Sequence, residues 1–216
     1  LTLSLKLAAT GNVTTGSKID GSAFTGTLSL TGNTTAAGST AATIGDILIG
    51  GSGNDTLKAA INGGTLTGGA GSDTFKFLVT GTNAQATDSA SLYTTSAGTS
   101  AITRITDFQA GVDKILLEID NTAGSLVSGT SMILANAQTI ATAADLTAVY
   151  AGISAIAAST NGAALSGVVV TVSAGTAAGT YLYINDATAS VSNSADMLIN
   201  ITGISGTLTA NDFSFA

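Results

Sequence analysis

A nine-residue repeat between residues 41 and 76 constrains the fold of this chain more than any other feature of its sequence. Four successive blocks read AATIGDILI, GGSGNDTLK, AAINGGTLT and GGAGSDTFK. Their eighth positions are all large and apolar: Leu48, Leu57, Leu66 and Phe75. Their sixth positions are Asp46, Asp55, Gly64 and Asp73. A short fixed period of this kind predicts a solenoid of short strands and tight turns rather than a conventional sandwich.

The second and fourth blocks, at 50–58 and 68–76, each match the nonapeptide GGxGxDxUx, in which U is a large apolar residue. In this they resemble the calcium-binding repeats of RTX proteins. The resemblance implies a parallel β-roll, a kind of β-solenoid, in which two nonapeptides complete one coil and blocks two apart stack on one edge. Asp55 and Asp73 would then lie on neighbouring turns around a common Ca²⁺. The candidate ligands are the backbone carbonyls of Gly50, Ser52, Gly68 and Ala70, the carboxylates of Asp55 and Asp73, and the neighbouring polar residues Asn54 and Ser72.

The chemistry of these turns suits a hard cation, because Ca²⁺ takes about 6–8 oxygen ligands and accepts both carbonyls and carboxylates. Without a cation the stacked carboxylates would repel one another, and glycine-rich turns lose much conformational entropy when they become ordered. Folding is therefore expected to depend on calcium. The alternative is a metal-free solenoid, in which Asp55 and Asp73 accept hydrogen bonds within the turns.

Two further aspartates are candidate ligands outside the full repeats. Asp46 lies on the opposite edge, where the next equivalent residue is Gly64 and alanines replace the turn glycines, so only a partial site is expected there. Asp107 belongs to the pattern I-x-DF-x-x-G-x-DKI, which resembles the segment that closes the β-roll of secreted RTX proteins. The resemblance implies that Asp107 caps the last calcium turn, with or without binding the ion. In the same pattern, Asp113 and Lys114 are expected to form a surface ion pair that contributes little to stability.

The rest of the chain predicts a mainly β fold with three parts: a β-roll at 1–80, a polar loop or insertion at 81–100, and a β-rich domain with one helix at 101–216. Apolar residues at helical spacing predict the helix at 142–159, with Thr142 as its N-cap. Two strands are expected on either side of a turn at 109–111. Further strands of a sandwich or extended sheet are expected at 167–173, 180–186, 196–204 and 207–216.

Composition excludes most classes of function. The chain has no cysteine and no histidine, which removes disulfides, thiolate nucleophiles, Ser–His–Asp triads and the usual zinc sites. No motif for acid–base catalysis is present, so the chain is not expected to be an enzyme. The net charge of −7 argues against nucleic acid as a partner. No apolar stretch is long enough to cross a bilayer as a helix.

Two further resemblances suggest a function. Residues 17–33 resemble segments that precede RTX repeats in bacterial surface-layer proteins, and residues 180–216 resemble the C-terminus of RTX proteins exported by type I secretion. No cleavable signal peptide is visible, and we expect the chain to be part of a longer polypeptide. The resemblance implies a secreted, calcium-dependent structural protein that self-assembles into a surface layer on the cell. Its expected partners are further copies of itself, the type I secretion machinery and, as a further candidate, a cell-surface polysaccharide.

The alternative is a calcium-triggered folding and export domain at the C-terminus of a secreted enzyme, adhesin or toxin. RTX regions of similar sequence are found in all these classes of protein, so the repeat alone leaves both functions open.

Overall fold

The structure is a computed structural model that describes residues 1–7, 16–32, 45–60, 63–80, 102–120, 132–159, 166–184 and 197–216. These residues form two mostly parallel β-sheets and one α-helix. The expected loop at 81–100 lies outside the described residues. Among the described helices, none is long and apolar enough to cross a membrane.

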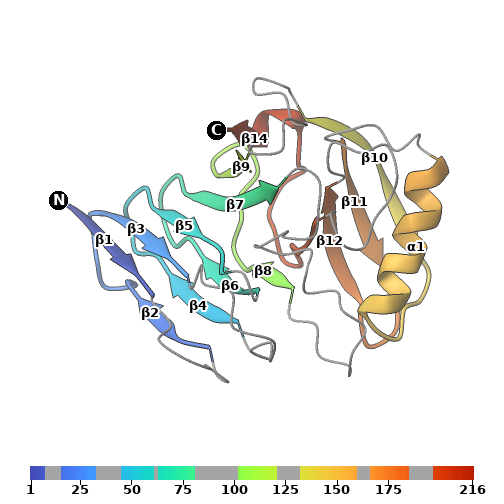
Figure 1. Cartoon of the computed structure of the whole chain (residues 1–216), viewed down its shortest axis with the longest axis horizontal. Coiled ribbons are helices and arrows are strands. Elements are labelled where there is room, and N and C mark those ends of the chain that lie inside the picture. Colours follow the sequence, from blue (N-terminus) through green and yellow to red (C-terminus); the bar gives the residue numbers. More distant parts are fainter. Residues whose placement is uncertain are drawn as a thin grey trace.

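A six-stranded sheet is parallel throughout (Figure 1). Its strands, in spatial order, are β1 (Thr2–Lys6), β3 (Thr27–Thr31), β5 (Thr56–Lys58), β7 (Thr74–Thr80), β9 (Lys114–Asp120) and β14 (Phe213–Phe215). An eight-stranded sheet faces it, with the spatial order β10 (Ile133–Ile140), β11 (Ser166–Val172), β12 (Gly179–Ile184), β13 (Met197–Asn200), β8 (Thr103–Ile105), β6 (Gly64–Thr67), β4 (Asp46–Ile49) and β2 (Lys18–Asp20). From β1 to β9 the chain alternates between the two sheets, so each pair of consecutive strands completes one circuit.

The spacing of the circuits confirms the predicted stacking of blocks two apart. Thr56 pairs with Thr74, and Asp46 pairs with Gly64, each across 18 residues of sequence. The other circuits differ in length, since Thr56 also pairs with Ser29 and Thr74 also pairs with Lys114. The strands nevertheless remain in register, so insertions between them are accommodated in the connections.

The apolar column of the repeat forms the core between the two sheets. Its members are at most 1% exposed: Leu48, Leu57, Leu66 and Phe75. Alternation along β3 adds Leu28 and Leu30 to the same layer, while its serine and threonines point outward. Burying each such side chain stabilises the fold by about 1.5–3 kcal/mol. Strands β8, β9 and β14 extend the two sheets begun by the first 80 residues, and Phe213 of β14 packs against the same core.

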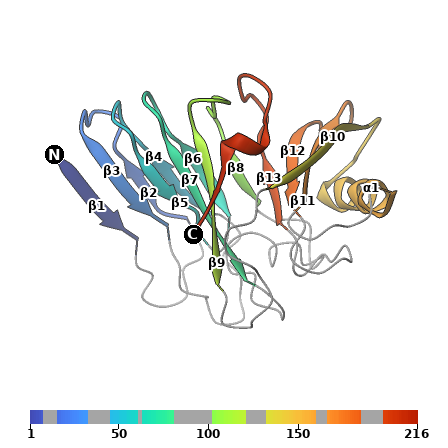
Figure 2. The ribbon, with the colours of Figure 1, turned by 90° about the horizontal axis from the view of Figure 1, so that it is seen from above.

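The helix α1 (Leu146–Ser159) lies at the far end of the stack from β1, against the extension of the eight-stranded sheet (Figure 2). Its Val149 and Ile153 are buried in a second apolar cluster with Val170 of β11 and Tyr181 of β12. The helix begins later than predicted, and Asp145, not Thr142, caps it. The N–H of Ala148 donates to Asp145 Oδ1 at 2.8 Å, the bond that an N-cap aspartate makes with the third helical residue.

Candidate metal site

Four turns lie on one edge of the stack, where the chain passes from the eight-stranded sheet to the six-stranded sheet. They span residues 21–26, 50–55, 68–73 and 106–113. Backbone hydrogen bonds join them: the N–H of Ser52 donates to the carbonyl of Phe24 at 3.0 Å, and that of Ala70 donates to the carbonyl of Gly51 at 3.0 Å. The two full nonapeptide turns are therefore neighbours within a continuous edge.

The turn at 68–73 explains why the repeat requires glycine. Gly69 and Gly71 have φ angles of 99° and 122°, a region that residues with a side chain rarely adopt. A Cβ on Gly69 would also lie 2.1 Å from the carbonyl oxygen of Gly51 in the neighbouring turn. The glycines thus allow both the turn conformation and the close stacking of turns.

A column of aspartates runs along this edge, each immediately before a strand of the six-stranded sheet. The N–H of Leu28 donates to Asp55 Oδ1 at 2.7 Å, that of Asp55 to Asp73 Oδ1 at 2.8 Å, and that of Asp73 to Asp113 Oδ1 at 2.9 Å. All three aspartates are buried. Each carboxylate thereby ties the turn that carries it to the preceding coil. We call Asp55, Asp73 and Asp113 the aspartate ladder.

The second oxygens of two of these carboxylates accept hydrogen bonds within their own turns. Asp55 Oδ2 accepts from the N–H of Gly51 at 2.6 Å, and Asp113 Oδ2 accepts from that of Gln109 at 2.8 Å. This bonding is the role that the metal-free alternative assigns to Asp55. It leaves lone pairs available on the same oxygens, because a carboxylate oxygen can accept one N–H and still coordinate a cation.

The central member of the ladder, Asp73, has a raised pKa. The pKa of Asp73 is raised to about 6, and burial is the largest cause. The hydrogen bond from the Asp55 N–H opposes the rise, whereas the nearby carboxylates of Asp113, Asp55 and Asp107 contribute to it. A negative charge on Asp73 is therefore under-compensated by the protein groups around it, which favours a proton or a cation at this position.

Two of the predicted ligand atoms lie so close to Gly50 that a side chain there would collide with both. A Cβ on Gly50 would lie 2.1 Å from the carbonyl oxygen of Gly68 and 2.5 Å from Asp55 Oδ2. Likewise, a Cβ on Gly68 would lie 2.3 Å from Asp73 Oδ2. A carbonyl and two carboxylates beside side-chain-free positions are a donor set that suits Ca²⁺.

Carboxylates alone do not complete such a site. Within the described part of the chain, no three acidic side chains come together closely enough to hold a metal ion. A cation bound here would need backbone carbonyls as well, which is the type of ligand predicted for Gly50, Ser52, Gly68 and Ala70. Ser52 and Ala70 lie on the exposed side of their turns.

Asn54 and Ser72 link the two full repeats directly. The N–H of Ser72 donates to Asn54 Oδ1 at 2.9 Å, and both residues are exposed. In this arrangement the Asn54 side chain holds the neighbouring turn in place through its amide oxygen.

Asp107 lies beside the fourth block, as the resemblance implied. Its Oδ1 accepts from the N–H of Gly68 at 2.9 Å, and its Oδ2 accepts from that of Gly69 at 2.8 Å. Asp107 therefore caps the turn at 68–73 with both oxygens. Its additional role as a calcium ligand stays a prediction.

Asp46 is separated from these residues. It begins β4, whereas Asp55 ends the turn that follows β4, so the two carboxylates lie on opposite edges of the stack. Asp46 is buried, and its Oδ1 accepts from the N–H of Ser17 at 2.9 Å. Its neighbour in register is Gly64, as the repeat predicted.

Sequence reasoning missed Asp113, and the predicted surface pair with Lys114 is wrong. Asp113 is buried in the ladder, while Lys114 Nζ donates to the carbonyl of Asn211 at 2.6 Å. The signal was present, because GVDKI at 111–115 has the same GxDxU pattern as GNDTL at 53–57 and GSDTF at 71–75. It was hidden by the distance of this segment from the periodic blocks.

Asp212 is a second missed carboxylate on the same side of the sheet. It immediately precedes β14, and its oxygens accept from the N–H groups of Gly111 and Thr209, both at 2.7 Å. The C-terminal strand is thereby tied to the turn at 106–113.

The chain matches no protein-family model, and a search of curated proteins also finds no match.

Proposed function

We propose that this chain is a calcium-dependent structural protein of a bacterial surface layer, in which the stacked turns at 50–55 and 68–73 bind Ca²⁺. The observation that carries the proposal is that Asp55 Oδ2 and the Gly68 carbonyl oxygen, from adjacent turns, both lie close to Gly50. The nonapeptide match brings Gly50 and Gly68, which are 18 residues apart, to equivalent positions of neighbouring turns on one edge.

The finer description of the fold as an RTX β-roll belongs to the same proposal. Its support is the alternation of β3 to β9 between two parallel sheets, together with the glycine turns that join them. A roll of this kind has little core in each coil, so its stability depends on contacts between coils.

The residues of this chain that would hold the ion are Asp55, Asp73 and the turn carbonyls around Gly50 and Gly68. Bound calcium would neutralise carboxylates that the protein itself leaves under-compensated. Asp55 and Asp73 would keep their backbone hydrogen bonds while binding, because those bonds position the carboxylates at the turn. Asp107 would hold the turn at 68–73 from the other side.

The composition supports a structural rather than a catalytic role. The chain has no histidine and no cysteine, only one glutamate, and a net charge of −7. Divalent cations can bridge acidic surfaces that otherwise repel, so calcium would serve assembly as well as folding. Secretion through a type I pathway and attachment to a surface polysaccharide are further parts of the proposal, and they rest on the sequence resemblance alone.

The second candidate is a calcium-triggered folding and export domain of a longer secreted protein. The observation that favours it is the C-terminal segment, which adds β14 to the six-stranded sheet and buries Leu208 and Phe213. Such a module would fold with calcium but remain unassembled.

Electron microscopy and light scattering of the purified chain distinguish these functions. A surface-layer protein is expected to form ordered two-dimensional sheets when calcium is added, and the sheets should dissolve in excess chelator. An export domain is expected to give folded, unassembled particles in the same buffer. Failure to form sheets at any calcium concentration would reject the surface-layer assignment.

A further inference from the structure

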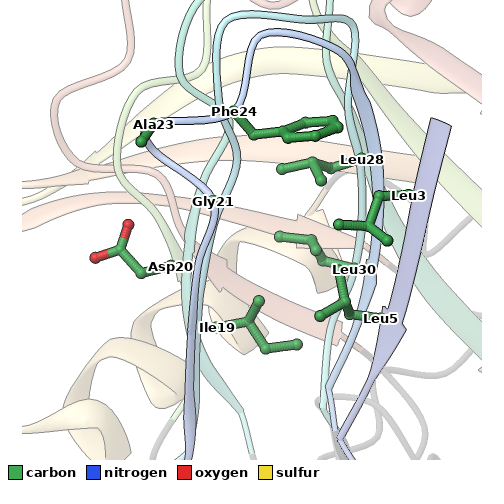
Figure 3. Close-up of a pocket in the computed structure, with 9 residues that line it drawn as sticks. All are labelled: Leu3, Leu5, Ile19, Asp20, Gly21, Ala23, Phe24, Leu28 and Leu30. Atoms are coloured by element: carbon green, nitrogen blue, oxygen red, sulfur yellow. The ribbon is translucent and has the colours of Figure 1, made fainter. Parts of the chain in front are cut away.

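The end of the stack formed by β1, β2 and β3 has an apolar hollow of about 300 Å³ (Figure 3). Leu3 and Leu5 of β1 line it, together with Ile19 of β2 and Phe24 of the following turn. Leu3 is 44% exposed and Leu5 is 37% exposed, whereas the equivalent leucines of β3 are buried. No described residue covers this end of the core.

Both sheets terminate together at this end. β1 is the edge of the six-stranded sheet, and β2 is the edge of the eight-stranded sheet. At the opposite end the sheets are uneven, because one stops at β14 while the other continues through β13, β12 and β11 to β10. A partner that added a strand to both sheets at once would cover the open end, and the far end of another copy has no such matched pair of edges.

We infer that a second copy of this chain covers the open end through a two-fold, end-to-end contact in which β1 pairs antiparallel with β1 and β2 with β2. The same end of another copy presents two sheet edges at the same spacing. Edge strands with exposed apolar side chains and free backbone groups readily pair in this way. The inference specifies the surface used for the self-association in the proposed function, and rests on that part of it.

The positions of Leu5 and Ile19 determine where the two-fold axis lies, and therefore which residues of the two copies face each other. Figure 3 shows these two side chains at the same level across the hollow, which both of them line. A two-fold axis at that level places each of them opposite its own equivalent. It also places Leu3, which lines the hollow, opposite Leu7 of the second copy, which packs against the core.

Charge complementarity supports the second copy as the partner. With the axis at Ile19, Lys18 lies opposite Asp20 of the second copy, and Asp20 lies opposite Lys18 of the second copy. Lys18 and Asp20 already form an exposed ion pair of 2.8 Å within one chain, so the contact would combine two such pairs into a quartet of alternating sign. Lys6 would face the uncharged Ser4 of the second copy, so no like charges meet.

Charge reversal tests this register. In sedimentation analysis of the full chain with calcium, Lys18→Asp and Asp20→Lys are each expected to weaken dimerisation by about tenfold, since each places like charges opposite each other twice. The double variant, with both residues exchanged, should return the dissociation constant to within about threefold of the original. Lys6→Asp is the matched control and should change it by less than about threefold.

A single cysteine gives an independent test, because the chain has no cysteine of its own. Ile19→Cys would lie opposite its equivalent at the Cα separation of directly paired strands, which permits a disulfide. Oxidation should therefore produce a covalent dimer, whereas Leu1→Cys, four residues from the axis along β1, should not. Equal cross-linking of the two variants would reject the register.

Two outcomes would overturn the inference: a chain that remains monomeric at high concentration, or a double charge variant as weak as the single ones. A monomeric chain would indicate that another segment or protein covers the hollow. These results are separate from the calcium proposal. A monomer that still binds calcium rejects only the dimer. An Ile19→Cys variant that forms the covalent dimer but binds no calcium rejects only the metal site.

Discussion

Asp73 accepts a hydrogen bond from the backbone N–H of Asp55 across successive coils, and its neighbour Thr74 donates to the carbonyl of Asp55. Both hydrogen bonds are 2.8 Å long, and the acceptor of the first is Asp73 Oδ1. The first contact uses the side chain of the repeat aspartate, and the second uses the parallel sheet. An aspartate at this position therefore fixes both the turn that it ends and the alignment of that turn with the neighbouring coil. This explains why aspartate recurs at the sixth position of the repeat.

The raised pKa of Asp73 predicts a pH dependence of the calcium-free protein. Its pKa in the fold is about 6, against an ordinary value of 3.8, so the folded state binds the proton more tightly than the unfolded state does. The stabilising contribution of Asp73 is therefore complete below about pH 4 and is lost as the pH rises through 6. Asp73→Asn should remove this loss. Denaturant unfolding in chelator from pH 4 to 7 measures it, and parallel curves for the two proteins would contradict the assignment.

Gly50→Ala is expected to damage the fold and the metal site together. The added methyl would meet the Gly68 carbonyl oxygen and Asp55 Oδ2, so the turns must move apart. We expect a loss of about 1–3 kcal/mol in unfolding free energy and a weaker response to calcium. Ser52→Ala, in the exposed part of the same turn, is the matched control. Equal behaviour of the two variants in thermal unfolding and calcium titration would argue against close stacking at Gly50.

Phe75→Ala should be among the most destabilising substitutions in the chain. Phe75 is fully buried between the sheets, and its ring centroid lies 5.9 Å from that of Phe108. Truncation leaves a cavity in a core that has few alternative side chains in each coil, so we expect a loss of about 3–5 kcal/mol. Thr74→Ala, one residue away and half-buried, should cost much less. Chemical denaturation in saturating calcium gives both values, and similar losses would place Phe75 outside the core.

Glu118→Gln should have a small effect that depends on salt. Lys58 and Lys76 each place Nζ 2.6 Å from one oxygen of Glu118, and all three side chains are about one-quarter exposed. Burial raises the pKa of Glu118, but the hydrogen bonds from the two lysines outweigh it and lower the pKa overall. We expect a cost of about 0.5–1 kcal/mol at low ionic strength that shrinks in high salt. A loss that is independent of salt would indicate a packing role instead.

The sequence predicted the parts of the site that follow the fixed period. The 18-residue offset was enough to place Asp55 beside Asp73, because the block between the two full repeats, 59–67, keeps the nine-residue length. The helix was also predicted, although its cap was not. Thr142 and Asp145 are both acceptable N-cap residues, and the tertiary packing of Val149 and Ile153 decides where the helix begins.

The period fails where the connections become longer. Asp113 follows Asp73 by 40 residues of sequence rather than 18, so self-comparison does not align the two. Only the local GxDxU pattern preserves the signal there. Strand β10 was missed for a different reason, since ILANAQTI has little apolar alternation and is a strand because it pairs with β11. Strand preference of this kind depends on the neighbour rather than on the segment itself.

The central claim is that the turns at 50–55 and 68–73 bind calcium, and that the binding stabilises the fold. A calcium titration of the purified chain, followed by isothermal calorimetry and far-UV circular dichroism, tests it most directly when the double variant Asp55→Asn, Asp73→Asn is measured beside it. Asp145→Asn is the control for a lost carboxylate away from this edge. We predict saturable calcium binding with a gain of β-structure in the original chain and the control, and at least a tenfold loss of affinity in the double variant. Identical calcium binding by all three proteins, or no binding by any, would contradict the account.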